Sequence, residues 1–239
     1  MAVQFNKVTW YSKIIAMVIF VAMPFVGFYY GIQYGEVMQT ANPGSGTVQT
    51  PAPIVSAGSD YYQSVSAWQT DRHDDASFSI AYPLDFAIDD NHVLTPSTDW
   101  RLNSSNVSGL KVLTITIPSA FEPQTNFGDA KLTVGYSANS AAAAQCLRDD
   151  QTGGLATPSS TAVVNGIHFA VFHSSSAGAG NLYDTTSYRT IHGGYCYAVE
   201  YTIHSTQIAN YPAEYGLQPF DPAPLTDVLD RMVGTFKFL

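Results

Sequence analysis

The chain has 239 residues, a formal net charge of −9 at pH 7 and only 12% charged residues. This length allows one domain of ordinary size with a real hydrophobic core. No cluster of Lys and Arg occurs in the sequence, which argues against nucleic-acid binding and against electrostatic attachment to anionic lipid. Sparse charge beside 15 Tyr and 18 Gly is typical of β-rich domains that work outside the cytoplasm.

The N-terminal segment contains an uncharged apolar stretch over residues 14–34, preceded by Lys7 and Lys13. At about 1.5 Å per residue, a helix of this length would span about 31 Å, enough for the hydrocarbon core of a bilayer. Because the lysines lie only before the stretch, residues 1–13 should stay in the cytoplasm and the rest should be exported. We therefore expect a single transmembrane signal anchor, with the cell membrane as a partner. A cleaved signal peptide and a buried core helix are the alternatives.

Residues 35–66 are rich in Pro, Gly and Ser and contain few large apolar side chains. Such a composition cannot bury enough surface to offset the entropy of ordering the chain, so we expect a flexible linker. The folded extracytoplasmic domain should then occupy residues 67–239.

The first half of this domain consists of short runs in which apolar and polar residues alternate. Residues 68–73 and 78–83 are predicted as two strands, in which Phe78, Ile80 and Tyr82 share a face and Pro83 ends the ladder. A short helix is predicted to begin after Asn139 or Ser140. This helix covers residues 141–150. Before it, strands are predicted over residues 93–102, 110–117 and 131–136.

The second half predicts a three-strand meander and then a helix–strand pair. The meander strands are separated by Gly-rich turns and cover residues 167–175, 182–191 and 195–204. Asp221-Pro222 opens an amphipathic helix that ends at Gly234, and residues 235–239 return as a final strand. The predicted fold class is α+β, a mostly antiparallel β-sheet with a C-terminal helix packed on it.

Both ends of this domain resemble the PsbP-like (PsbP-related) domain family. Residues 78–86, FSIAYPLDF, are similar to the opening motif of these domains, where the family usually has Gly at the position of Ser77. An amphipathic helix followed by a short Phe-x-Phe strand, here Phe236 and Phe238, is also how such domains end. The family includes the extrinsic photosystem II protein, a Ran-binding nuclear import factor and many small exported or membrane-anchored bacterial proteins. Its known members bind unrelated partners and share no catalytic set, so the resemblance implies a fold and not an activity.

Cys146 and Cys196 are the only cysteines. In an exported domain, two cysteines most simply form a structural disulfide, here between the short helix and a strand. The functional alternative is a nucleophilic Cys196 with His204 and Glu200 on the same strand face. Residues eight apart on a strand lie about 26 Å apart, which is too far for a thiolate and its base. We therefore expect a disulfide and no catalytic residue.

The other polar residues are weak candidates for a metal or cofactor site. His168 and His173 lie at odd spacing, which puts them on opposite faces of a strand. Gly178 and Gly180 do not precede a helix, so they form a hairpin tip and not a phosphate cradle. An acidic stretch could ligate Ca²⁺ but lacks an EF-hand register, so a solvated loop is favoured; it contains Asp85, Asp89, Asp90 and Asn91. We expect no metal and no cofactor.

Residues 205–221 form an irregular stretch of a length that is uncommon in compact domains and often functional. Tyr211, Tyr215 and Phe220 are its candidate binding surface; the alternative is that these rings pack over an open sheet edge. We therefore expect a non-catalytic binding module of the cell envelope, with a protein or envelope partner and no nucleic acid. An exported hydrolase with a non-standard active site and a purely structural envelope protein are the alternatives.

Overall fold

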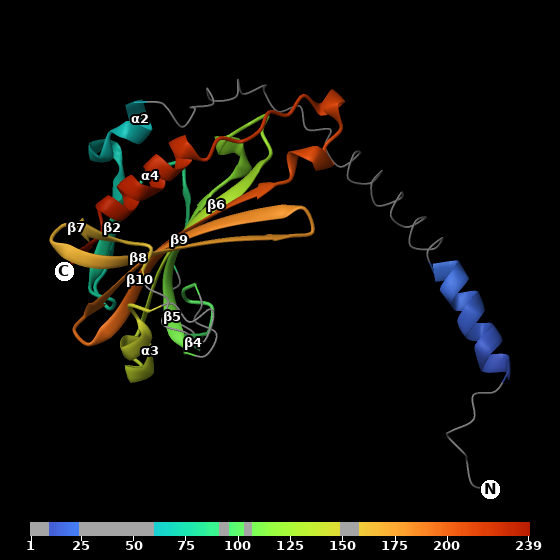
Figure 1. Cartoon of the computed structure of the whole chain (residues 1–239), viewed down its shortest axis with the longest axis horizontal. Helices are drawn as coiled ribbons and strands as arrows, with labels where there is room; N and C mark the ends of the chain where they lie inside the picture. Colours follow the sequence, from blue (N-terminus) through green and yellow to red (C-terminus); the bar gives the residue numbers. More distant parts are fainter. Residues whose placement is uncertain (1–9, 24–59, 91–95, 103–106, 149–157) are drawn as a thin grey trace, which may run out of the picture. The chain divides into compact units, whose positions relative to one another are not determined.

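The computed structural model describes residues 10–23, 60–90, 96–102, 107–148 and 158–239 (Figure 1). These residues belong to two units, one with the helix over residues 10–23 and the other with everything from residue 60 onward. The second unit is α+β, as predicted: antiparallel strands dominate it and a C-terminal helix packs on them.

The described helix over residues 10–23 overlaps only the first part of the predicted membrane span. Fourteen residues correspond to about 21 Å of helix, short of the ~30 Å hydrocarbon core of a bilayer. Among the described residues, no helix is both long enough and apolar enough to cross a membrane. The predicted single span and signal anchor over residues 14–34 is therefore wrong on this finding. Residues 24–34 of that prediction lie outside the described residues.

Eight antiparallel strands form the main sheet of the second unit. They are β3 (Ala87–Asp90), β4 (Pro96–Ser97), β5 (Gly109–Ile117), β6 (Phe127–Ser137), β7 (Ser160–Val164), β8 (Ile167–Gly178), β9 (Asn181–His192) and β10 (Tyr195–Thr206). Their spatial order is β3-β5-β6-β10-β9-β8-β7, with β4 also beside β5. The predicted meander is confirmed, since β8, β9 and β10 pair consecutively. β10 pairs on its other side with β6 and therefore lies inside the sheet.

A second, three-stranded sheet joins the two ends of this unit. Its strands are β1 (Gln69–His73), β2 (Phe78–Tyr82) and β11 (Lys237–Phe238), in the order β1-β2-β11. The hairpin of β1 and β2 matches the two predicted strands. Ser77 in its turn has φ 54°, the left-handed region that Gly favours. This is the position at which PsbP-like domains usually have Gly.

The C-terminal helix α4 (Ala223–Gly234) agrees closely with the prediction. Pro222 is its N-cap residue, and Asp221 Oδ1 accepts a hydrogen bond from the main-chain N–H of Ala223, the first helical residue, at 3.0 Å. The predicted apolar stripe is buried; it consists of Leu225, Val228, Leu229, Met232 and Val233. Because the whole stripe is buried, α4 packs on the sheet through the face that its sequence period indicates.

The helix α3 (Ser140–Gln145) is shorter than predicted. Asn139 caps it, since its side chain accepts a hydrogen bond from the main-chain N–H of Ala141 at 2.8 Å. Cys146 follows directly as the C-cap residue.

Three local features differ from the sequence-based expectation. The predicted linker includes the short helix α2 (Asp60–Gln63), in which Tyr62 is buried against the rings of Phe86 and Phe121. The folded part therefore reaches back beyond residue 67. The predicted strand over 93–102 is reduced to β4 among the described residues, and β7 was not predicted.

The predicted acidic loop is in part the edge strand β3, which pairs with β5. Asp89 and Asp90 lie in this strand, and Asn91 lies outside the described residues. Charged residues are common on edge strands because they discourage pairing with another chain.

Two hydrophobic cores lie on opposite faces of the eight-stranded sheet. Along β10, Val199 and Tyr201 point into the larger core, which α4 and the three-stranded sheet complete. Cys196 and Ala198 point to the other face, into a smaller cluster with Trp100. This alternation is the two-residue period of a strand that is covered on both sides.

Candidate binding pocket

A pocket of about 430 Å³ lies on the α4 side of the eight-stranded sheet. Side chains from β7, β8, β9 and β10 line it, together with residues of α4 and Pro222 just before that helix. Its volume falls within the roughly 300–1,000 Å³ that is usual for small-molecule sites. Its size and its mixed lining make it a candidate for a binding site.

Two tyrosines and one aspartate join the sheet to the helix at this pocket. The hydroxyls of Tyr188 on β9 and Tyr201 on β10 both donate to Asp230 Oδ1 on α4, at 2.9 Å and 2.8 Å. Tyr188 pairs with Val199 in the sheet, two residues from Tyr201, so both rings lie on the same face. Their centroids are 6.4 Å apart. The site is thus held by rigid elements and not by loops.

Burial raises the pKa of both tyrosines well above the ordinary value, and the nearby Asp230 carboxylate raises the pKa of each further. Both phenols are therefore neutral at physiological pH. A neutral phenol can donate or accept a hydrogen bond, but it is not a general base poised near neutral pH. This chemistry suits binding and orientation of a ligand more than proton abstraction.

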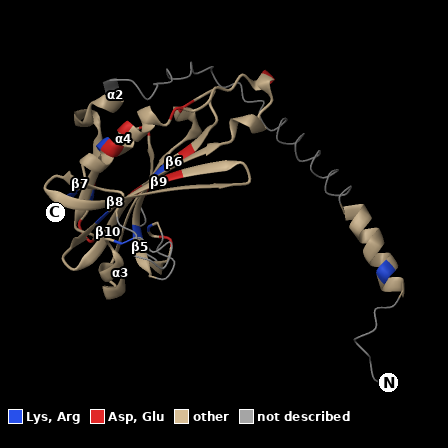
Figure 2. Cartoon of the chain, viewed as in Figure 1, with Lys and Arg blue, Asp and Glu red and all other residues tan. Residues whose placement is uncertain are grey.

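The rest of the lining combines polar and apolar side chains. His173 Nδ1 lies 3.0 Å from Thr186 Oγ1, and Asp184 accepts a hydrogen bond from Ser175 at 2.5 Å. None of the lining residues is Lys or Arg. Figure 2 shows few charged residues in this domain, and some of the acidic ones lie on α4. The apolar part of the lining consists of Ala162, Val171, Ile203 and Pro222.

The predicted binding surface over residues 205–221 is irregular, as expected, and contains two 3₁₀ turns. Tyr215 is 61% exposed. Tyr211 is half-buried, and its hydroxyl accepts a hydrogen bond from Thr206 at 2.9 Å. Phe220 is also half-buried and packs on Phe127, with ring centroids 4.9 Å apart. Of the three rings, Tyr215 is thus the one that is mostly exposed, and their role in binding remains a prediction.

The same segment borders the pocket at both of its ends. It begins within the last residues of β10, two positions after Ile203, and it ends directly before Pro222. Both Ile203 and Pro222 line the pocket. The predicted surface and the pocket are therefore neighbours along the chain.

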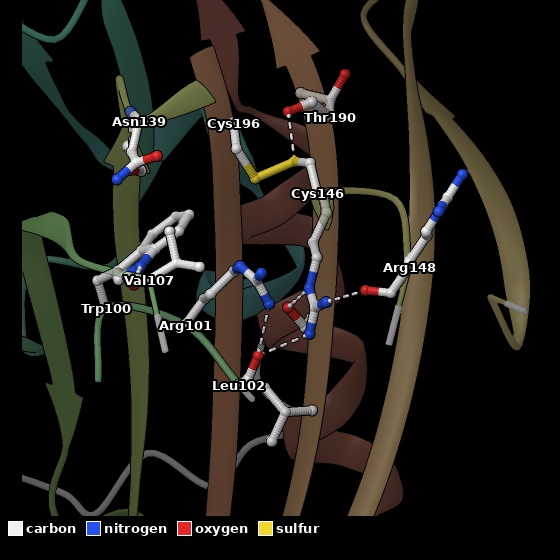
Figure 3. The surroundings of a disulfide bond; sticks show 12 residues. Trp100, Arg101, Leu102, Val107, Asn139, Cys146, Arg148, Thr190 and Cys196 are labelled. Carbon is white, nitrogen blue, oxygen red and sulfur yellow. Dashed lines mark hydrogen bonds between the residues drawn. A yellow bond between two sulfur atoms is a disulfide. The ribbon is translucent and has the colours of Figure 1, made fainter. Parts of the chain in front are cut away.

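The predicted disulfide between Cys146 and Cys196 is confirmed, with Cα atoms 5.5 Å apart (Figure 3). Both thiols are consumed by this bond, which removes the alternative of a nucleophilic Cys196. The bond joins the end of α3 to β10 and closes a sequence separation of 50 residues.

A buried arginine stands on the same sheet face as the disulfide. The Arg189 side chain is fully buried and donates to Ser187 Oγ at 3.0 Å and to the main-chain oxygens of Arg148 and Leu102 at 3.0 and 2.9 Å. Its guanidinium also lies 4.2 Å from the ring centroid of Phe172. Figure 3 shows the two carbonyl groups that it binds, one from each segment that covers this face. Arg189 therefore fastens both segments to the sheet.

Glu200 fastens one of those segments a second time. Its carboxylate accepts a hydrogen bond from the Leu102 main-chain N–H at 2.7 Å. Burial raises the pKa of Glu200, although that hydrogen bond and the charges of Arg189 and Arg101 oppose the shift. Glu200 also lines a smaller hollow of about 280 Å³. Because one carboxylate oxygen already binds the main chain, we interpret this residue as structural.

Among the described residues, no three His, Cys, Asp or Glu side chains gather as metal ligands would. Three histidines instead stack on aromatic rings. His73 stacks on Phe78, His192 on Phe238 and His204 on Tyr183, with centroids 4.8, 3.8 and 4.7 Å apart.

Tyr188 and Asp230 were not predicted as site residues from the sequence. Strand parity assigns Tyr201 to the core face, and the same rule applied to β9 would have placed Tyr188 beside it. Asp230 had no signal, because it lies at the border of the apolar stripe of α4 and its partners are 29 and 42 residues away.

Comparisons with known proteins show distant similarity only. No protein-family model matches the sequence, and no curated protein matches it. The solution structure of cyanobacterial PsbP from Synechocystis sp. PCC 6803 shares 11% identity, covering 82% of this chain and 99% of that chain, with a TM-score of 0.29. A crystal structure from Bacteroides thetaiotaomicron VPI-5482 shares 12% identity over 69% of this chain, with a TM-score of 0.32. This chain spans about half of that protein, 46% of its length. Scores this low carry no argument, so membership of the PsbP-like family stays a prediction.

Proposed function

We propose that this chain is a non-catalytic binding module that works in an oxidising compartment outside the cytoplasm. The disulfide supports the compartment, because such bonds persist mainly where proteins are not kept reduced. The finer assignment to the PsbP-like family is part of the proposal. It is supported by the motif over residues 78–86 and by the C-terminal helix–strand pair.

The observation that carries the proposal is the pocket itself. Two aromatic rings from the sheet and a carboxylate from α4 are fixed to one another by hydrogen bonds, so the site is organised before any ligand arrives. A preformed site loses less entropy on binding. The neutral tyrosines supply hydrogen bonds and contact area.

We assign the ligand to a component of the cell envelope. The bordering segment over residues 205–221 adds Tyr215, whose exposed ring can extend the contact beyond the pocket. Tyr211 and Phe220 would hold that segment in place through the contacts described above.

The test is a screen of small neutral, cationic and anionic molecules against the full chain, followed by methyl NMR. The methyl groups of Ala162, Val171 and Ile203 line the pocket and report on it directly. Ala162→Phe should fill the pocket and weaken binding by about tenfold or more, since 1.4 kcal/mol already gives that factor. Val163→Phe is the matched control, because Val163 is the next residue of β7 and is exposed. If no molecule shifts these methyl signals, or if Ala162→Phe binds as the wild type does, the proposal fails.

A further inference from the structure

We propose that this pocket binds an organic cation, a small primary or quaternary ammonium group that carries a short apolar chain. The inference rests on the proposed function and names the class of ligand for the same site. It is carried by the aromatic rings, the carboxylates and the apolar patch that the fold brings together there.

The aromatic rings supply the first part of the recognition. Tyr188 and Tyr201 both line the pocket, and their centroids are 6.4 Å apart. A cation over the face of an aromatic ring is attracted by the ring quadrupole. Tyr188 is half-buried and its ring can be reached by a ligand, whereas Tyr201 is only 4% exposed. The two hydroxyls are tied to Asp230, which fixes both rings in place.

The carboxylates supply the second part. Both tyrosine hydroxyls use Asp230 Oδ1, and Oδ2 has no hydrogen bond among the described residues. Asp184 adds a second carboxylate to the lining. Arg231, the nearest cationic side chain in the helix sequence, pairs instead with Asp227 at 3.0 Å. Since the lining contains neither Lys nor Arg, the site favours positive charge and disfavours anions.

The apolar patch and the volume set the size of the ligand. Ala162, Val171 and Ile203 lie in the same lining as the rings and carboxylates. A pocket of about 430 Å³ accommodates an ammonium head with a short chain. A free metal cation would leave the apolar part of the lining uncovered, and a purely apolar ligand would bring no positive charge to Asp184 and Asp230.

The experiment is a methyl NMR titration of the full chain at constant ionic strength. The probes are tetramethylammonium chloride and n-butylammonium chloride. The matched neutral and anionic controls are tert-butanol and sodium butyrate. The cations should bind about tenfold more tightly than the neutral control and should shift the methyl signals of Ala162, Val171 and Ile203.

Asp230→Asn tests the charge, because the amide oxygen can still accept both tyrosine hydroxyls. It should weaken binding of the cations by about tenfold. The control Asp227→Asn lies one turn earlier on α4, outside the lining, and should leave binding unchanged. Should Asp230→Asn fail to fold, Tyr188→Phe and Tyr188→Leu form a second pair. The phenyl ring should retain cation binding, and the leucine should lose it several-fold.

The outcomes separate the two proposals. Binding of the neutral and anionic controls in the pocket at the affinity of the cations would overturn the inference and leave the proposed function standing. An equal loss of binding in both aspartate variants would mean unspecific attraction to an acidic domain, which also overturns it. If no probe of any charge shifts the pocket methyl groups, both proposals fall.

Discussion

The two faces of the eight-stranded sheet are stabilised by different means. On the α4 face, a continuous set of aliphatic and aromatic side chains is covered by the helix and the smaller sheet. On the opposite face, six residues form the apolar cluster in the described part of the chain, and Ala170 and Phe172 are also buried on this face. There a disulfide, the buried Arg189 and the bonded Glu200 hold the covering segments.

The difference shows how a sheet can be covered without a second large core. Hydrophobic burial stabilises in proportion to the apolar area removed from water, and the α4 face supplies that area. Among the described residues, the apolar cluster on the disulfide face is smaller than the core under α4. A covalent bond limits the freedom of the unfolded chain, and buried hydrogen bonds fix the loop and the end of α3. The four experiments that follow test this division of roles.

Removal of the disulfide should have the largest effect. For a loop closed over 50 residues, the chain-entropy model gives a loss of about 4 kcal/mol in the free energy of unfolding. Cys146→Ala with Cys196→Ala should show this loss in urea unfolding. Dithiothreitol should destabilise the wild type by a similar amount and leave the double variant unchanged. A double variant as stable as the wild type would mean that the disulfide face does not depend on its covalent bond.

A cavity under α4 should lower the free energy of unfolding slightly less than removal of the disulfide does. Leu229 is fully buried in the larger core, so Leu229→Ala should lower the free energy of unfolding by about 3 kcal/mol through lost burial and an unfilled cavity. Urea unfolding measures this loss of free energy. Mass spectrometry should show that the disulfide remains intact in the variant. Leu84→Ala is the control, because Leu84 is 61% exposed. Equal losses in the two variants would argue against a core that is concentrated under the helix.

Glu200 should make a smaller contribution to the free energy of unfolding, and this contribution should depend on pH. Its pKa is raised in the folded state, so the folded protein binds this proton more tightly than the unfolded chain does. Its contribution to stability is present below the ordinary glutamate pKa and is lost as the pH rises through the raised value. Glu200→Gln remains neutral and should lack this decline. The two free energies of unfolding are compared from about pH 4 to 8.

Glu214→Gln is the control for the same titration, because Glu214 is an exposed residue of the segment before α4. It should keep the decline with pH that the wild type shows. Parallel curves for Glu200→Gln and the wild type would show that the burial of this carboxylate has no consequence for stability.

The smallest effect on the free energy of unfolding is expected for a substitution at Tyr215, which lies in the segment between β10 and α4. Its ring is 61% exposed, so Tyr215→Ala should change the free energy of unfolding by no more than about 0.5 kcal/mol. Phe220→Ala, in the same segment, should cost more because this ring packs on Phe127. Thermal unfolding of the two variants tests this order. If Tyr215→Ala destabilises as strongly as Phe220→Ala, its ring belongs to the packed part and not to a binding surface.

Local patterns in the sequence were sufficient for most of the elements. The alternation along β10, the apolar stripe of α4 and the turn residues of the meander depend only on the periods of strands and helices. The disulfide followed from two cysteines in a chain expected to be exported. Composition was misleading at the N-terminus, where the apolar stretch over residues 14–34 predicted a span. It was also misleading at Tyr62, where a Pro- and Gly-rich segment concealed a ring that packs in the core.

The tertiary structure decided which residues meet. The separate sheet of β1, β2 and β11 brings the two ends of the domain together, and no local pattern records that pairing. The pocket likewise depends on three residues from β9, β10 and α4, of which Tyr201 and Asp230 are 29 positions apart. Periodicity assigns each of these side chains to one face of its strand or helix. It does not determine the position of the helix along the strands on which it packs. That position is set by the packing of the whole apolar stripe, which is a property of the folded chain and not of any one segment.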